Sequence, residues 1–469
     1  MIYTMQAKTF IYSAALVVAL TSCNQTKVQR PNVLLILADD AGYADFGFNG
    51  STDIETPNLD QLASRSTVFS DGHVMGSGSS PSRAMLMTGR YGHRFGYECN
   101  PECPEQGLPL EEVTMAQVLK KAGYRTSCFG KWHLGAADYQ HPNQKGFDEF
   151  WGFLGGARSF YYHPEFVSNI LLHYQHNGTT EKFDGYLTDE LTNRAVDFIK
   201  QDSEKPFFMY LSYNDVHGPI EPTQKYIDMQ DDTKLKGKRK LYAAKITALD
   251  TGVGKVVKAL EETGKLDNTM VIFLSDNGGA VPNYSSNLPL KGFKGTKFEG
   301  GHRVPMFMFI PGVSDAKSNF SGITSSLDIF ATLVDLLKIS VSELPNPLDG
   351  VSLLPYLVGE KQGNPHDQLC WRKNRTKAIR FHDYKLICMN DVDTVLYDLK
   401  NDMIECKDIK NDSVKLFHQL FHQLNKWEDD CCIPPKWTEK NYIERVESYQ
   451  KKLLSNQIFS AEDLRKRSK

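Results

Sequence analysis

The sequence predicts an α/β fold in which helices flank a mostly parallel central sheet, followed by a smaller α+β subdomain. Buried parallel strands are continuous apolar runs, and four such runs each end in a group of polar residues: 32–40, 124–133, 206–217 and 270–279. Helix-like segments alternate with these runs at residues 55–65, 114–123, 187–201 and 240–265. Alternating strands and helices are typical of a parallel sheet that is covered on both faces.

The last quarter of the chain has a different pattern. Residues 348–367 are rich in Gly, Pro and Asp, which indicates a boundary between two structural units. Short strand-like pieces follow at 375–390 and 394–399, and polar helical sequence continues to the end. We therefore expect a catalytic domain over residues 31–365 and a C-terminal subdomain with an antiparallel sheet over residues 366–469.

The N-terminus predicts export. Lys8 precedes an apolar run over residues 10–20, which is too short for a comfortable membrane span but has the length of a signal-peptide core. Small residues leading to Cys23 resemble the bacterial lipobox, which predicts a lipoprotein signal peptide over 1–23 and a tether over 24–30. A signal peptide cleaved elsewhere, with an incidental cysteine, is the alternative. We expect a periplasmic or cell-surface protein, held at a Gram-negative outer membrane only by a lipid on Cys23.

Charge and cysteine content narrow the choice of partners. The formal net charge of −3 over 469 residues gives no global attraction to nucleic acid, so no such partner is expected. Eight cysteines remain after Cys23, a number that permits disulfides in an exported protein without requiring them. Cys99 and Cys103 could close a small loop or stay reduced, and no cysteine-rich or histidine-rich cluster suggests zinc.

Two pairs of oxygen-bearing side chains follow the predicted strands. Asp39 and Asp40 end the first apolar run, and Asp276 and Asn277 end the fourth. Ligands collect at the carboxyl ends of parallel strands, so these side chains should meet at one edge of the sheet. Oxygen ligands favour Ca²⁺ or Mg²⁺ over zinc or copper. Asp and Asn are also common turn residues, so either pair alone has a purely structural explanation.

A cluster of serines lies in the stretch MGSGSSPSRAMLMTGRY, residues 75–91. Pro81 suits a first helical turn, which predicts a helix start with Ser79 or Ser80 near the N-cap. A helix N-terminus is also a natural binding site for anions. The surroundings do not match the Gly-x-Ser-x-Gly pattern of acyl-transfer hydrolases, so a Ser–His–Asp mechanism is not expected.

Three motifs together resemble the sulfatase family. The stretch SSPSRAMLMTGR is similar to the family signature Cys/Ser-x-Pro-Ser-Arg followed by Leu/Met-Thr-Gly-Arg. GKWHLG (130–135) is similar to a second signature, and LKGFKGTKFEGGHRVP (290–305) resembles a third block. Agreement runs from about Asn32 to the boundary segment and, more loosely, beyond it. The resemblance implies an alkaline-phosphatase-like fold.

The resemblance also implies roles for individual residues. Ser79 matches the residue that sulfatases convert to formylglycine (3-oxoalanine), which here requires a maturase that accepts serine. The implied calcium ligands are Asp39, Asp40, Asp276, Asn277 and the oxygen on residue 79. The polar residues implied around the sulfate are Arg83, Lys131, His133, His217 and Lys294. Lys297 is a rival for the place of Lys294, although the match at FKGT favours Lys294.

The chemistry implied by the family explains these residue types. A sulfate monoester is anionic, so cations must surround it before a nucleophile can approach. One hydroxyl of a hydrated formylglycine attacks sulfur, and loss of a proton from the other then expels sulfate. The resemblance suggests His133 as the base for that proton, and His217 as the acid for the leaving alcohol with help from Lys294.

The expected substrate is a sulfated carbohydrate, such as a host glycan, a glycosaminoglycan or an algal polysaccharide. Sulfated galactose or N-acetylgalactosamine is the first expectation, with glycosaminoglycan uronate or glucosamine next. The aromatic and basic segment 155–166 and the segment 380–386 are candidates for lining a sugar subsite. Two other functions remain open: a phosphate or phosphonate monoester hydrolase of the same superfamily, and a glycan-binding surface lipoprotein with a decayed active site.

Overall fold

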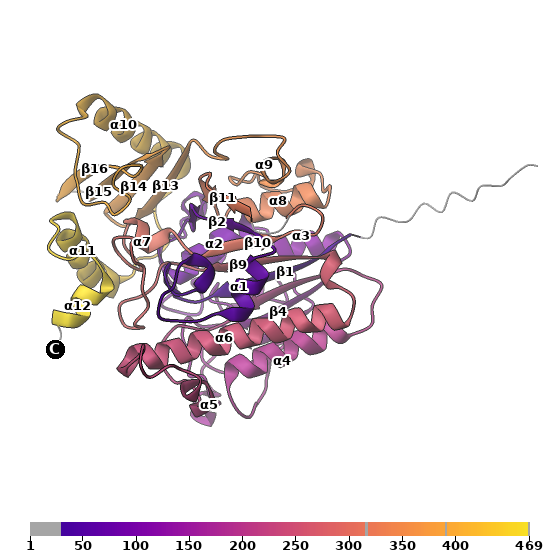
Figure 1. The fold of residues 1–469 in the computed structure, drawn as a ribbon. Coiled ribbons are helices and arrows are strands. Elements are labelled where there is room, and N and C mark those ends of the chain that lie inside the picture. The colour runs from indigo at the N-terminus through magenta and orange to yellow at the C-terminus, as the bar shows by residue number, and fades with distance from the viewer. Residues whose placement is uncertain (1–29, 315–317, 390–391, 468–469) are drawn as a thin grey trace, which may run out of the picture.

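A ten-stranded sheet forms the centre of the molecule in the computed structural model, which describes residues 30–314, 318–389 and 392–467 (Figure 1). The strand order is β11-β2-β10-β9-β1-β8-β4-β5-β6-β7. The five central strands are parallel to one another: β9 (Thr269–Ser275), β1 (Asn32–Ala38), β8 (Phe207–Ser212), β4 (Arg125–Lys131) and β5 (Glu149–Phe153). The outer strands are β11 (Ser318–Phe320), β2 (Thr67–Phe69), β10 (Met306–Phe309), β6 (Gln175–His176) and β7 (Thr179–Thr180). The predicted α/β fold with a mostly parallel sheet is confirmed.

Helices cover both faces of this sheet. One face packs against α1 (Pro57–Ala63), α4 (Leu187–Lys200) and α6 (Gly237–Glu262). The other packs against α2 (Ser79–Thr88), α3 (Met115–Lys121) and α8 (Asp328–Leu336). Successive strand residues point to opposite faces, so Leu34 and Ile36 join the first core and Val33 and Leu35 the second. Burial on both faces explains why the central strands are continuous apolar runs.

Short elements connect these layers. They comprise α5 (Gln224–Asp228), α7 (Glu299–His302), α9 (Leu354–Leu357) and a small sheet of β3 (Gly72–His73) with β12 (Thr324–Ser325). Single 3₁₀ turns lie at Gly47–Asn49, Gly92–Phe95, Asp138–Gln140, Pro164–Phe166, Leu266–Asn268 and Val341–Glu343.

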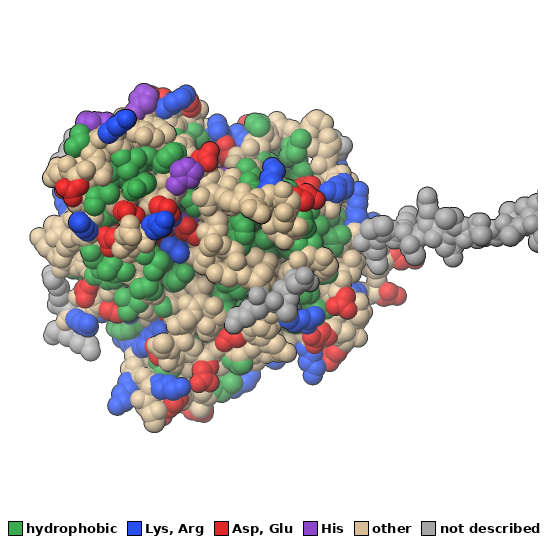
Figure 2. Space-filling view, turned by 45° about the horizontal axis from the view of Figure 1, so that its top comes forward, with side chains coloured by type: hydrophobic (Ala, Val, Ile, Leu, Met, Phe, Trp, Pro, Cys, Tyr) green, Lys and Arg blue, Asp and Glu red, His purple; other side chains and the backbone are tan. Residues whose placement is uncertain are grey.

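The C-terminal part carries a separate antiparallel sheet, as expected. Its strands lie in sequence order: β13 (Gln368–Lys373), β14 (Thr376–Phe381), β15 (Tyr384–Met389) and β16 (Asp393–Asp398). Three helices follow: α10 (Val414–Cys431), α11 (Lys440–Leu454) and α12 (Ala461–Arg467). Leu420 and Leu424 of α10 pack on Ile379 and Leu386 of the sheet. Acidic and basic side chains are interspersed over the face that Figure 2 shows, with hydrophobic side chains among them.

A buried ion network joins this second sheet to the first part of the chain. The Lys385 ammonium on β15 donates to Glu299 Oε1 of α7 at 2.8 Å and lies 2.9 Å from Glu405 Oε1. Burial alone would raise the pKa of Glu299, but Lys385 and the neighbouring His73 and His302 hold it well below its usual value. Carboxylate and imidazole atoms of His73, Glu299 and His302 lie within 4.8 Å of one another, as metal ligands do. The Lys385 ammonium, 3.1 Å from His302 Nε2, already fills this space, so the group is a domain contact.

Segment 380–386 therefore has a structural role. Besides Lys385, Arg380 is buried and lies 3.2 Å from Asp71 Oδ2. These two basic side chains serve the contact between the two parts of the molecule, so the expectation that segment 380–386 lines a sugar subsite is wrong for Arg380 and Lys385.

The remaining predictions from sequence concern cysteines and the N-terminus. Cys99 and Cys103 are both free, so the disulfide considered for them is not formed. No helix in the described ranges is long and apolar enough to cross a bilayer. The predicted signal peptide, Cys23 and all of the tether except Arg30 lie outside the described residues.

Candidate active site

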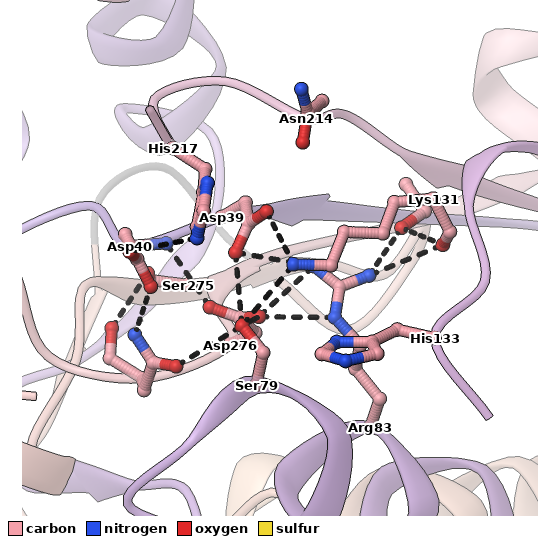
Figure 3. A network of polar contacts seen from close by, with 12 residues as sticks. Asp39, Asp40, Ser79, Arg83, Lys131, His133, Asn214, His217, Ser275 and Asp276 are labelled. Carbon is pink, nitrogen blue, oxygen red and sulfur yellow. Dashed lines mark hydrogen bonds and ion pairs between the residues drawn. The ribbon is translucent and has the colours of Figure 1, made fainter. Parts of the chain in front are cut away.

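The predicted site residues meet at the carboxyl edge of four adjacent strands (Figure 3). Asp39 and Asp40 directly follow β1, and Asp276 directly follows β9. Lys131 is the last residue of β4, and His217 lies five residues beyond the end of β8. Because β9, β1, β8 and β4 are neighbours and parallel, residues far apart in sequence converge at one place.

Three buried carboxylates form a candidate metal centre. Oxygens of Asp39, Asp40 and Asp276 lie within 4.8 Å of one another, and each residue is at most 1% exposed. The Asn277 side chain lies against them, donating from Nδ2 to Asp40 Oδ1 at 2.7 Å and accepting from Ser79 Oγ at 3.4 Å. Buried carboxylates at such distances need a counter-charge, and an all-oxygen set suits Ca²⁺ or Mg²⁺. The residues present fit a divalent cation.

Ser79 is the first residue of α2 and points into this centre. Its hydroxyl donates to Asp276 Oδ2 at 2.7 Å and lies 3.1 Å from Asp39 Oδ1. Gly78 is the N-cap, so the helix start predicted with Ser79 near the N-cap is confirmed, although no side chain caps the helix. The Ser80 hydroxyl instead bonds to the backbone oxygen of His133. The hydroxyls of Ser79 and Ser80 thus have different hydrogen-bond partners, and of the two only the Ser79 hydroxyl contacts the carboxylates.

Three cations balance the three carboxylates. Arg83 Nε donates to Asp276 Oδ2 at 3.0 Å, and Lys131 Nζ donates to Asp39 Oδ2 at 2.7 Å and lies 3.3 Å from Ser79 Oγ. Lys294 Nζ lies 2.5 Å from Asp40 Oδ1, and although burial opposes it, Asp40 raises the pKa of Lys294. A divalent cation added to this balanced cluster would leave it positive and ready to attract an anion.

The sequence left Lys297 as a rival for the place of Lys294. Lys297 Nζ donates to Ser77 Oγ at 2.6 Å, whereas Lys294 bonds to the carboxylate of Asp40. Lys294 is therefore the lysine of this segment that lies in the site.

The two histidines differ in environment. Burial and the charges of Lys131 and Arg83 lower the pKa of His133 well below its ordinary value, so its ring is neutral near pH 7. His133 Nδ1 is buried and has no partner among the described residues, which leaves it free to accept a proton. His217 Nε2 lies 3.7 Å from Asp40 Oδ2, and burial lowers its pKa while Asp39 and Asp40 oppose that shift.

The site opens on the side of His217 and Lys294. Their side chains are 23% and 21% exposed, whereas those of Arg83, Lys131 and Asp39 are 0% exposed. A substrate therefore meets His217 and Lys294 on its way to the reacting atom, which suits contacts with a leaving group.

Two site residues have a left-handed backbone. Asp40 and His133 adopt φ of 64° and 61°, as do a few non-glycine residues elsewhere in the described chain. Non-glycine residues in this region cost about 1–3 kcal/mol each and cluster at functional sites. Hydrogen bonds from Asn277, Asn283 and Lys294 hold the Asp40 side chain, and the His133 backbone N–H donates to the Leu154 oxygen at 3.1 Å.

Sequence reasoning missed several polar residues of this cluster. Asn283 Nδ2 donates to Asp40 Oδ2 at 3.0 Å, and Ser212 Oγ accepts from Arg83 at 2.6 Å. Asn214 donates from Nδ2 to the backbone oxygen of Arg158 at 3.2 Å, while its buried Oδ1 has no partner in the described part of the chain (Figure 3). Asn214 belongs to the same run of polar residues after β8 as His217, and this position was the only feature of the sequence that pointed to Asn214.

Lys245 is a further residue that the sequence did not indicate. It contacts the backbone that carries His217 and not the carboxylate cluster itself. It is fully buried on α6, and its ammonium donates to the backbone oxygens of His217 and, at 3.1 Å, Pro219. The same ammonium lies 3.6 Å from the ring centroid of Phe160. Burial lowers its pKa to about 8, although the charge of Asp215 opposes this. Lys245 thus fixes the backbone that carries His217.

Lys245→Met is expected to lower kcat by about tenfold to a hundredfold, because displacement of a reacting group by about 1 Å costs about that much. The carbonyl of His217 would lose its donor, while no group that touches substrate would be removed. Steady-state kinetics and thermal unfolding of the variant test this. Lys258→Met on the same helix is the control, since its side chain is 71% exposed. Equal kcat in both variants would contradict the positioning role.

The fold and the site together define a hydrolase of anionic esters with the alkaline-phosphatase-like architecture. Residues 31–339 match the family described as Sulfatase, and the chain belongs to that family. Residues 293–430 also match the C-terminal region described as N-sulphoglucosamine sulphohydrolase, C-terminal. The protein is thus a sulfuric ester hydrolase.

Relatives with known names agree. N-acetylgalactosamine-6-sulfatase of Mus musculus is 33% identical over 384 residues, covering 76% of this chain and 72% of the relative. Uncharacterized sulfatase YdeN of Escherichia coli is 31% identical over 398 residues, covering 73% and 68%. The solved structure of Ps i-CgsB in complex with k-i-k-neocarrahexaose is 36% identical with a TM-score of 0.82, covering 91% of this chain and 97% of that one.

Proposed function

We propose that the protein is a calcium-dependent sulfatase that removes sulfate from a carbohydrate, with a formylglycine made from Ser79 as nucleophile. The observation that carries this proposal is the Ser79 hydroxyl, which lies against Asp276, Asp39 and Lys131 at the centre of the carboxylate cluster. An unmodified serine has no strong base in its neighbour Asp39: burial raises the pKa of Asp39, but Lys131, His217 and Arg83 lower it to about 2.

The chain's own residues would divide the work. Asp39, Asp40, Asp276, Asn277 and the oxygen on residue 79 would hold the calcium ion, which would supply positive charge for the sulfate oxygens. A formylglycine hydrate would supply the attacking hydroxyl. Lys131 and Arg83 hold the carboxylates and offer positive charge to the sulfate. Neutral His133 accepts the proton of the remaining hydroxyl on residue 79. His217, with help from Lys294, protonates the sugar oxygen that leaves.

The substrate proposal rests on the names of the relatives and on the residues near the open side of the site. One relative is named for N-acetylgalactosamine 6-sulfate, and one solved structure holds a neocarrahexaose. We therefore place sulfated galactose or N-acetylgalactosamine first. In the aromatic segment 155–166, Phe160 is fixed by Lys245, while the guanidinium of Arg158 lies 4.8 Å from the Phe166 ring and 4.6 Å from the Tyr174 ring. Phe160 and Tyr174 are themselves fully buried and support this segment from within. The half-buried side chains of Tyr161, Tyr162 and His163 are the ones available to a sugar, and they support a subsite there.

The cellular setting is part of the same proposal. A serine-accepting maturase would modify Ser79, and the exported protein would be anchored through Cys23. Gel mobility of the protein from a native-like host, before and after Cys23→Ala, tests the anchor.

A panel of sulfated saccharides tests the activity. The expected result is sulfate release from galactose or N-acetylgalactosamine sulfates, with kcat/KM about a hundredfold above that for glucosamine and uronate sulfates, because a site built for one hydroxyl arrangement rejects others. Ion chromatography measures the product. p-Nitrophenyl phosphate and a phosphonate monoester are the comparison substrates, and a higher kcat/KM on either would favour the phosphate or phosphonate alternative.

A further inference from the structure

A cavity of about 260 Å³ adjoins the candidate active site on the C-terminal side. Lys294 lines it from the active site, and Lys373, Glu439, Arg445 and Tyr449 line it from the C-terminal subdomain. Pockets that enclose whole small ligands are about 300–1,000 Å³. The cavity is thus large enough for part of an oligosaccharide whose reacting sugar lies at Ser79.

The cavity begins one residue from the proposed nucleophile. Gly78 is part of its wall, and a Cβ atom added there would lie 3.6 Å from Lys373 Nζ. The backbone N–H of Ser80 donates to Asn100 Oδ1 at 3.0 Å, and Asn100 in turn bonds to Glu439 through its own N–H at 3.2 Å. The start of α2 is therefore linked directly to the C-terminal wall.

Basic side chains outnumber acidic ones in this cavity. Lys373 is buried and donates to Glu439 Oε2 at 2.8 Å, so these two charges satisfy each other. Lys294 is bonded to Asp40. Arg445 is exposed and forms no ion pair with any side chain that the structure describes. It is the cation of the wall that is available to a ligand.

An aromatic ring lies on the same face of α11. Tyr449 follows Arg445 by four residues, which places both on one side of the helix. The Tyr449 ring meets the Phe293 ring edge-on at 5.7 Å, and Phe293 immediately precedes Lys294. α11 lies beside the segment before α7, where Lys297 N–H donates to Gln450 (Figure 1). Glu447 also pairs with Arg375, so contacts before and after Tyr449 in sequence hold the helix that carries Arg445.

We propose that this cavity binds a second anionic group, on the sugar next to the one that loses its sulfate, through Arg445, with Tyr449 as the surface for the sugar ring. The proposal rests on the sulfatase function proposed above and makes the preferred substrate a multiply charged oligosaccharide. A sulfate ester and a uronate carboxylate share the chemistry that Arg445 recognises, since its guanidinium binds both through paired N–H groups.

The test compares three galactosyl disaccharides. One carries a single sulfate on the reacting sugar, the second also carries a sulfate on the neighbouring sugar, and the third carries a carboxylate there. Arg445→Gln is expected to lower the ratio of kcat/KM for the second substrate to that for the first by about tenfold, the size of a charged hydrogen bond. The loss should lie in KM. If the third substrate shows the same loss, the site reads charge; if it does not, the site is specific for sulfate.

Two further variants make the result decisive. Arg445→Lys should keep only part of the ratio, because an ammonium retains the charge but cannot form the paired N–H contact. Lys451→Gln, which removes an exposed charge elsewhere on α11, should keep all of it. An unchanged ratio in Arg445→Gln, or an equal fall in Lys451→Gln, would overturn the proposal. Turnover of the singly sulfated disaccharide by the wild-type enzyme tests the proposed function separately, because it does not depend on the ratio.

Discussion

Ser79→Ala is expected to abolish sulfate release while leaving the fold intact. The side chain contributes one oxygen to the carboxylate cluster and little apolar packing, since its Oγ contacts Asp276, Asp39 and Lys131. Removal of a covalent nucleophile costs at least about 10⁴-fold in kcat, because the remaining groups only bind and polarise the substrate. Sulfate release measures the loss, and circular dichroism on heating shows that the fold persists.

Ser80→Ala is the matched control for this prediction. It also removes one buried hydroxyl from the first turn of α2, but that hydroxyl bonds to Tyr97 and to the backbone of His133 rather than to the carboxylates. Activity within about tenfold of the wild type is expected, since loss of a neutral hydrogen bond is worth about 1 kcal/mol.

Mass spectrometry of the peptide with residue 79 should show a loss of about two mass units on conversion of serine to the aldehyde. Unmodified serine in an active enzyme, or turnover by Ser79→Ala, would contradict the nucleophile assignment.

The residues at strand ends were predictable because topology alone brings them together. Once four apolar runs are accepted as parallel strands, Asp39 and Asp276 must lie at one edge, whatever the loops do. This prediction needed no knowledge of side-chain geometry, and the family motifs identified Ser79 and Lys294. The apolar runs and the polar residues at their ends were therefore sufficient to predict the sheet and the position of the site.

Residues that act through tertiary contacts were not accessible in this way. Lys245 lies in a helix whose sequence gives no reason for a lysine to be buried, and its importance comes from the backbone oxygen of His217, which lies 28 residues away in sequence. Arg445 is one of many charges in polar helical sequence, and only packing shows that it faces the cavity. The predicted helix start near Ser79 is confirmed, but its cap is Gly78, and the Ser79 hydroxyl bonds to Asp276 and Asp39 rather than to the helix backbone.

Removal of metal is expected to inactivate the wild-type enzyme reversibly. Asp276→Asn is expected to inactivate the enzyme in a way that added calcium does not reverse. With three carboxylates within 4.8 Å of one another, loss of one charge weakens the hold on a divalent ion and leaves Arg83 beside one negative charge fewer. Dialysis against a calcium chelator should abolish wild-type activity, and calcium should restore it. A thousandfold excess of calcium over its Kd should raise the stability of the wild type by about 4 kcal/mol. The variant should bind little metal and show no such gain, as elemental analysis and thermal unfolding would measure.

Asp250→Asn separates loss of metal from simple loss of a buried charge. Asp250 is 2% exposed and accepts the N–H of Leu59 at 2.8 Å at the start of α1, away from the cluster. Its replacement should lower stability by about 1–3 kcal/mol, because an amide is a weaker acceptor than a carboxylate, yet leave metal content unchanged. Asp276→Asn removes a negative charge beside the fully buried Arg83, so its stability cost should be about 3 kcal/mol, accompanied by the loss of calcium response. An active, metal-free Asp276→Asn enzyme would contradict the metal site, since the three cations around the cluster would then be sufficient for sulfate without a divalent ion.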